Sequence, residues 1–230
     1  MFDLLIRNAQ VLDGTGAPAY LADVAVKDGK IAAVGKIAGE AAETVDAAGL
    51  TLAPGFIDVH GHSDFFMPLD PARASKLLQG VTTELCGQCG LGPAPVTEQN
   101  YSLYHKYLSQ QGIPMYPDDR TFTSFSAYLS RMEQTPAGIN LAYFIPHGTV
   151  RLAVMGFSHD APDDRQLAQM RELVEDAMQA GALGLSTGLA YAPGRFAATD
   201  ELAALTEPVG RYGGVYTSHL RDQGDQLEQS

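Results

Sequence analysis

The sequence is poor in several features that mark specialised classes of protein. Only two of its 230 residues are cysteines, Cys86 and Cys89, and two are too few for the disulfide framework of a small secreted domain. No run approaches the roughly 20 apolar residues that a membrane-spanning helix needs. Residues 1–7 lack the basic region, apolar run and small-residue cleavage site of a secretion signal. We therefore expect a cytoplasmic protein with no membrane partner.

Basic residues are also scarce. The chain has 15 Lys and Arg against 27 Asp and Glu, a net charge of -12. Nucleic acids and anionic membranes both favour clustered Lys and Arg, so we expect neither as a partner. The hydrophobic content of 45% is ordinary for a globular chain with a sizeable core. The length permits one large domain or two smaller ones.

The first fifty residues have the pattern of short strands and turns. An apolar-rich run over 4–12 ends in a turn, and Asp28-Gly29 separates two partly alternating runs, 23–27 and 30–34. Asp-Gly between alternating runs is the strongest short-range signal for a β-hairpin. We predict a small β unit here.

From residue 51 onward, strands alternate with helices. The predicted strands cover 51–60, 81–86, 139–145, 182–186 and 214–218. The predicted helices cover 72–79, two segments within 97–131, 163–180 and 200–212. This alternation indicates parallel βαβ units. Because five strands cannot close an eight-stranded barrel, we expect the sequence to be a fragment; a complete five-stranded open sheet is the alternative.

Two histidines, His60 and His62, end the apolar run 52–59. On an extended backbone, residues two apart point to the same face, so both imidazoles can reach one metal ion. Ligands gather at the carboxyl ends of parallel strands, which favours a metal site over two unrelated histidines. Asp58 or Asp64 could orient an imidazole by accepting its other ring N–H.

Cys89 follows the second predicted strand, on the same rim as the histidines. The pair Cys86-x-x-Cys89 could instead be a redox pair or half of a zinc knuckle. A redox pair needs a helix N-terminus to stabilise its thiolate, whereas glycines and Pro93 follow here. A zinc knuckle needs a second ligand pair nearby. We favour Cys89 as a metal ligand and Cys86 as a small buried hydrophobe.

Two further histidines follow predicted strands. His219 ends the fifth strand, and four candidate ligands at three strand ends favour one shared metal site. His147 follows the third strand, where it either lines the pocket or structures the loop. His105 and His159 have no such setting and are interpreted as surface residues.

The run 54–62, PGFIDVHGH, resembles the first-strand signature of the amidohydrolase superfamily. Those enzymes have a (β/α)8 barrel that holds one or two metal ions, and a small β-sandwich built from both chain ends. Residues 3–14 resemble the first strands of that sandwich. The resemblance implies an α/β fold, with a β-sandwich portion over 1–53. Over 54–230 it implies a partial (β/α)8 TIM-like barrel of about five of eight strands.

Three segments are similar, more narrowly, to the N-acyl-D-amino-acid deacylases (D-aminoacylases). They are GVTT and GQCG within 80–90, GLSTGLAYAPG over 184–194 and YTSHLRD over 216–222. In that family a cysteine is a metal ligand where relatives often use a carboxylated lysine, and this chain has no lysine after Lys106. The family commonly has Asn in place of Gln88.

The resemblance also implies a set of functional residues. The implied ligands of one or two Zn²⁺ ions are His60, His62, Cys89 and His219. The implied substrate-binding residues are Ala190 and Tyr191, with His147 as a further candidate. The family needs one more histidine and a catalytic aspartate. We expect both beyond Ser230, so that this chain would not catalyse by itself.

The implied reaction is zinc-dependent hydrolysis of the amide bond of N-acyl-D-amino acids. Metal-activated water attacks, and the aspartate acts as general base and then as general acid for the leaving amine. One alternative is a cyclic amide hydrolase of the dihydroorotase or hydantoinase type, because the first-strand motif suits both. The other is a non-catalytic metal-binding or assembly subunit made of this half alone. The segments around Cys89 and over 184–189 favour the deacylase.

Overall fold

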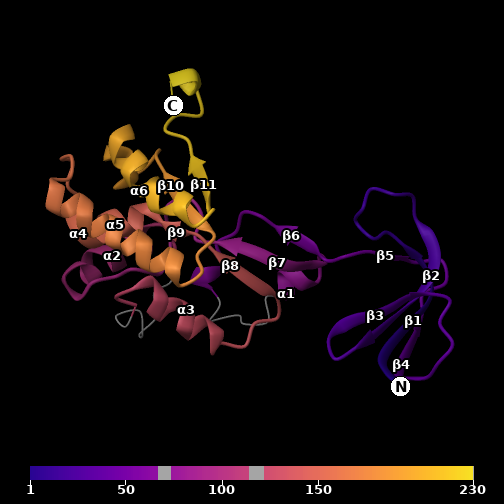
Figure 1. The fold of residues 1–230 in the computed structure, drawn as a ribbon. Helices are drawn as coiled ribbons and strands as arrows, with labels where there is room; N and C mark the ends of the chain where they lie inside the picture. The colour runs from indigo at the N-terminus through magenta and orange to yellow at the C-terminus, as the bar shows by residue number, and fades with distance from the viewer. Residues whose placement is uncertain (67–73, 114–121, 230) are drawn as a thin grey trace. The chain divides into compact units, whose positions relative to one another are not determined.

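The structure, a computed structural model, describes residues 1–66, 74–113 and 122–229 (Figure 1). The chain divides into two units, Met1–Gly55 and Phe56–Ser230. Among the described residues, no helix is both long and apolar enough to cross a bilayer.

The first unit is a five-stranded sheet built around β1 (Phe2–Val11). The other strands are β2 (Tyr20–Lys27), β3 (Lys30–Gly35), β4 (Ala41–Asp46) and β5 (Thr51–Leu52). β2 is antiparallel to β1 and β3, whereas β4 and β5 are parallel to β1. The predicted hairpin is confirmed: Asp28 and Gly29 have φ values of 52° and 71°, as a two-residue turn with two positive φ angles requires.

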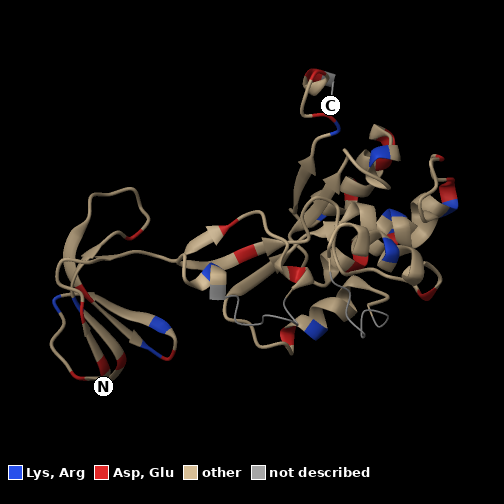
Figure 2. Ribbon diagram, turned by 180° about the vertical axis from the view of Figure 1, so that it is seen from behind, with Lys and Arg blue, Asp and Glu red and all other residues tan. Residues whose placement is uncertain are grey.

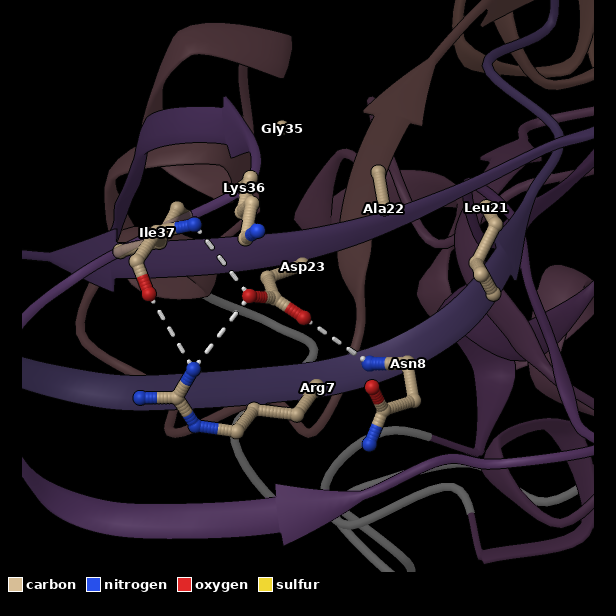
Figure 3. A pocket seen from close by; sticks show the side chains of 8 residues that line it. All are labelled: Arg7, Asn8, Leu21, Ala22, Asp23, Gly35, Lys36 and Ile37. Atoms are coloured by element: carbon tan, nitrogen blue, oxygen red, sulfur yellow. Dashed lines mark hydrogen bonds and ion pairs between the residues drawn. The ribbon is translucent and has the colours of Figure 1, made fainter.

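A cavity of about 400 Å³ on the first unit is organised by Asp23 (Figure 3). One carboxylate oxygen accepts from the backbone of Asn8 at 3.0 Å, and the other accepts from the backbone of Ile37 at 3.2 Å and from Arg7 at 3.3 Å. The two backbone bonds outweigh partial burial and lower the pKa of Asp23. These bonds hold the irregular stretch of β1, where Asn8 has a φ of 61°.

The second unit contains two three-stranded parallel sheets. One has the order β6-β7-β8, with β6 (Phe56–Asp58), β7 (Val81–Cys86) and β8 (Asn140–Tyr143). The other has the order β11-β10-β9, with β9 (Ile145–Pro146), β10 (Gly184–Gly188) and β11 (Val215–His219). Only Phe144 separates β8 from β9, and its N–H donates to the Cys86 carbonyl at 2.9 Å. The segment 140–146 therefore belongs to both sheets, and the predicted parallel pairing is confirmed.

Six α-helices are described in this unit. They are α1 (Ala74–Leu77), α2 (Glu98–Gln110), α3 (Phe125–Glu133), α4 (His147–Met155), α5 (Asp164–Gln179) and α6 (Thr199–Arg211). Short 3₁₀ turns cover Ser63–Phe65, Gly194–Phe196 and Leu227–Gln229. The main core joins Met170 and Val174 of α5 to Leu185 of β10 and Leu205 of α6, all fully buried. Figure 1 shows α5 and α6 beside β9 and β10.

Two predicted strands differ from the structure, and one helix was not predicted. The predicted strand over 51–60 is two strands, β5 in the first unit and β6 in the second, because Pro54 between them supplies no backbone donor. The predicted strand over 139–145 is divided between β8 and β9 at Phe144, where the chain passes from one sheet to the other. Helix α4 was not predicted, because its Gly148, Thr149 and Val150 favour helix only weakly. Residues 72–73 of a predicted helix and residues 114–121 lie outside the described residues.

Candidate metal centre

Three of the predicted ligands converge in the second unit. His60, His62 and Cys89 each offer one ligand atom, and these atoms all lie within 4.8 Å of one another. His60 Nε2 lies 3.1 Å from Cys89 Sγ. A nitrogen and a sulfur that bind one tetrahedral zinc ion are about 3.5 Å apart, so this pair already has nearly the spacing that a shared ion requires. Two imidazoles and a thiol are the donor set that zinc prefers.

The backbone of the histidine turn is fixed by the neighbouring strand β7. The Gly61 N–H donates to the Leu85 carbonyl at 3.0 Å, and the Ser63 N–H donates to the Glu84 carboxylate at 3.2 Å. A Cβ at position 61 would lie 1.7 Å from Glu84 Oε1. Only glycine lets the turn approach this buried carboxylate.

The loop that carries Cys89 is held by β10 and the loop after it. The Gly90 N–H donates to Ser186 Oγ at 3.1 Å, and the Tyr191 hydroxyl donates to the Cys89 carbonyl at 2.5 Å. Cys89 itself has a left-handed φ of 57°. Burial raises the pKa of the Cys89 thiol, so metal binding at this site would have to displace a proton.

Gln88 joins three strand ends near the histidine turn. Its amide nitrogen donates to the Val59 carbonyl at 3.0 Å, and its amide oxygen accepts from Thr217 Oγ1 at 3.1 Å. Val59 follows β6, Gln88 follows β7, and Thr217 belongs to β11. No role of Gln88 was predicted from the sequence.

His219, the fourth predicted ligand, lies outside the group of three ligand atoms. Its ring contacts Tyr191 edge to face, with ring centroids 5.3 Å apart, and its carbonyl accepts from the Leu189 N–H at 2.9 Å. Tyr191 thus lies between His219 and the Cys89 loop. Ligation by His219 stays a prediction.

Asp58 and Asp64, the two aspartates that flank the histidines, accept hydrogen bonds from backbone N–H groups. The hypothesis was that one of them accepts from an imidazole N–H. Asp58 accepts from the His60 N–H at 3.2 Å and from Lys76 Nζ at 2.5 Å. The Asp64 carboxyl is buried and accepts from the Gly87 N–H at 3.1 Å. Burial raises the pKa of Asp64 to about 7.

His147, one of the three predicted substrate-binding residues, is buried. Its side chain is 0% exposed, and its Nε2 lies 2.9 Å from Glu201 Oε1. A side chain enclosed between α4 and α6 favours the alternative interpretation, that His147 structures the loop, and substrate binding by His147 stays a prediction. The other two substrate-binding candidates, Ala190 and Tyr191, are partly exposed beside the Cys89 loop.

The remaining cysteine and histidine interpretations agree with the structure. Cys86 is a fully buried free thiol in the main core, and burial raises its pKa far above the ordinary value. His105 and His159 are exposed.

Comparison with known proteins identifies the family to which this chain belongs. Residues 43–214 match the amidohydrolase family, and the chain belongs to this family. It is 38% identical over 227 residues to the D-aminoacylase of Alcaligenes xylosoxydans xylosoxydans, a match that covers 98% of this chain and 46% of that protein. The chain thus spans about half the length of the curated relatives it matches.

Solved structures give the same assignment. An N-acyl-D-glutamate deacylase from Bordetella bronchiseptica, complexed with zinc and a phosphonate inhibitor, is 35% identical and superposes with a TM-score of 0.87 over 99% of this chain and 47% of that one. The L-hydantoinase of Arthrobacter aurescens, at 23% identity and a TM-score of 0.60 over 95% of this chain and 41% of that one, shares the fold. The structure is therefore an amidohydrolase-type fold similar to that of D-aminoacylase and the N-acyl-D-glutamate deacylase.

Proposed function

We propose that this chain forms part of a zinc-dependent enzyme that hydrolyses the amide bond of N-acyl-D-amino acids. The observation that carries the proposal is the convergence of His60, His62 and Cys89 within 4.8 Å. The 38% identity to a D-aminoacylase across nearly the whole chain supports it. The bound metal would be one or two Zn²⁺ ions, held by these three residues together with His219.

The proposed architecture places the metal at the carboxyl ends of parallel strands. Residues 54–230 would form about five strands of a (β/α)8 barrel, and residues 1–53 part of a β-sandwich. Support comes from the parallel pairing of all six strands that the structure describes after residue 55. His60 and Cys89 follow the carboxyl ends of β6 and β7, and His219 ends β11.

Each protein group has a separate task in the proposed reaction. The imidazoles and the Cys89 thiolate hold the metal, which when bound polarises the scissile carbonyl and makes water nucleophilic near neutral pH. Gln88 and Tyr191 keep the ligand-bearing backbone in place through their bonds to Val59 and Cys89. The partly exposed face of Ala190 and Tyr191 would contact the substrate.

The expected partner is a small N-acyl amino acid and not a nucleic acid or membrane. The net charge of -12 supports this expectation. Figure 2 shows Lys and Arg dispersed over several elements, with Asp and Glu interspersed among them. Three ion pairs between α5 and α6 or within α6 involve Arg171 and Arg211. We expect a cytoplasmic location.

The test is metal analysis and a deacylase assay on the protein as its gene encodes it, with Cys89→Ala and His219→Ala variants. We expect bound zinc in the unmodified protein and a loss of both zinc and deacylase rate in each variant. Unchanged zinc content and rate in both variants would refute the proposal. A parallel panel of cyclic ureides tests the alternative reaction, because turnover of those compounds alone would identify a cyclic amide hydrolase.

A further inference from the structure

A buried charged residue lies directly beneath the histidine turn. Glu84 of β7 is 0% exposed. Its two carboxylate oxygens accept from the Ser63 N–H at 3.2 Å and the Ser63 hydroxyl at 2.5 Å. The same carboxylate occupies the space that a side chain at position 61 would need. Glu84 therefore contacts the backbone on the C-terminal side of His60-Gly61-His62.

Asp58 fixes the other side of the same turn. Its carboxylate accepts from the His60 N–H at 3.2 Å. The register of the parallel pair β6–β7 places Asp58 directly beside Glu84. Two neighbouring carboxylates on paired strands repel each other, so this arrangement needs a cation.

Lys76 of α1 is that cation. Its Nζ lies 2.5 Å from Asp58 Oδ2 and 3.6 Å from Glu84 Oε1. Partial burial disfavours the ammonium, but the bond to Asp58 and the charge of Glu84 outweigh burial and raise the pKa of Lys76. One ammonium thus links the two carboxylates that hold the two ends of the turn.

We propose that Glu84 and Lys76 are positioning residues of the metal centre. They hold the backbone of residues 58–63 so that the His60 and His62 imidazoles face Cys89 before a metal ion arrives. Only Glu84 of these three groups is fully buried, and such a partly buried ion-pair network is a poor source of stability compared with packed apolar residues. Metal ligands, in contrast, must be held to within about 0.5 Å. The inference that this positioning raises the affinity for zinc rests on the proposed function. The inference that Glu84 and Lys76 hold the backbone of residues 58–63 does not.

The experiment compares Lys76→Met, Lys76→Arg and Glu84→Gln with the unmodified protein. Zinc affinity is measured by competition with a chromophoric chelator, and hydrogen exchange of the peptide that covers residues 58–63 is measured on the metal-free protein. Asp23→Asn is the matched control, because it removes the charge of a comparable ion pair, Arg7–Asp23, in the first unit. Mutation of a residue that holds a metal ligand in place typically lowers metal affinity about 10–100-fold.

We expect zinc affinity to fall at least tenfold in Lys76→Met and Glu84→Gln, and the 58–63 amides to exchange faster in both. Lys76→Arg should recover most of the affinity, and Asp23→Asn should leave both readouts unchanged. Affinity and exchange equal to those of the unmodified protein in Lys76→Met and Glu84→Gln would overturn the inference. Equal losses in Asp23→Asn, or no recovery in Lys76→Arg, would also overturn it.

The two readouts separate this inference from the proposed function. If the unmodified protein binds no zinc, the proposed function fails, and the exchange of the metal-free turn still decides whether Glu84 and Lys76 position it. If zinc binds but exchange and affinity are unchanged in the variants, the function stands and the positioning role is wrong.

Discussion

At position 61, the space beside the backbone is filled by a carboxylate. An alanine there would place its Cβ 1.7 Å from Glu84 Oε1 and 2.4 Å from Glu84 Cδ, so the buried side chain would have to leave its bonds to Ser63. We expect Gly61→Ala to destabilise the second unit by about 1–3 kcal/mol, the usual cost of overpacking, and to weaken zinc binding. The urea midpoint and chelator competition measure the two effects.

Gly210 is the matched control at this scale. It lies in α6 with a non-positive φ and no atom within 4 Å of an added Cβ. Gly210→Ala should therefore raise the free energy of unfolding by about 0.5–1 kcal/mol, because alanine restricts the conformations of the unfolded chain. The urea midpoint should rise accordingly. If both alanine variants changed stability by the same amount, the steric argument at position 61 would be wrong.

At the scale of elements, the buried contact between α4 and α6 depends on Glu201. Burial alone would raise the pKa of this carboxyl, but the hydrogen bond and charge of His147, with the charge of Arg151, outweigh burial and lower it below 4.5. A carboxyl with a lowered folded pKa stabilises the protein above its unfolded pKa, and this contribution is lost as the pH falls through the folded pKa. The stabilisation is therefore present at neutral pH and disappears below about pH 4.5.

We expect Glu201→Gln to cost about 3–5 kcal/mol at pH 7, because Arg151 would stay buried beside a neutral amide. The difference from the unmodified protein should shrink as the pH is lowered below 4.5. Melting temperatures between about pH 3 and pH 8 test this. The exposed Glu207→Gln should change stability by less than about 0.5 kcal/mol, and a constant difference at every pH would contradict the charge-based explanation.

Helix α5 begins with a capping box. The Asp163 side chain accepts from the Gln166 N–H at 2.7 Å, and the Gln166 side chain accepts from the Asp163 N–H at 3.0 Å. Asp163→Ala should cost about 1 kcal/mol, whereas Asp163→Asn should cost little, because asparagine caps helices as well as aspartate. Urea denaturation compares the two, and an equal loss in both would mean that charge, not the cap bond, stabilises this end.

Elements with a strong local pattern could be predicted from the sequence, and elements set by tertiary contacts could not. Helix α5 has both apolar periodicity and a cap, and it was predicted to within one residue of Asp164–Gln179. The short β5 and β9 depend on partners far away in sequence, β1 and β10. Only Pro54, between β5 and β6, gives a local signal of either division. Helix α4 is formed by residues with weak helix propensity whose first turns are buried.

At the scale of the whole molecule, the convergence of His60, His62 and Cys89 could be predicted because the carboxyl ends of parallel strands meet at one rim. The contacts that hold the backbone around these ligands could not be predicted. The contact between Glu84 and the turn depends on the register that places Asp58 beside it, and the bond from Gln88 to Thr217 spans 129 residues. No sequence periodicity encodes such distances. The same limit applies to the buried contact between His147 and Glu201, which lie 54 residues apart.

Zinc should stabilise the second unit, which contains every candidate ligand. A ligand that binds only the folded state at about 1,000 times its Kd adds about 4 kcal/mol, so chelation should lower the melting temperature and added zinc should restore it. Cys89→Ala should abolish this response. Cys86→Ala should retain the zinc response, because Cys86 lies in the core and not at the metal centre. The lost packing of Cys86 should lower the melting temperature of this variant with and without zinc. A full zinc response in Cys89→Ala would show that the thiol is not a ligand, and its loss in both variants would point to general destabilisation.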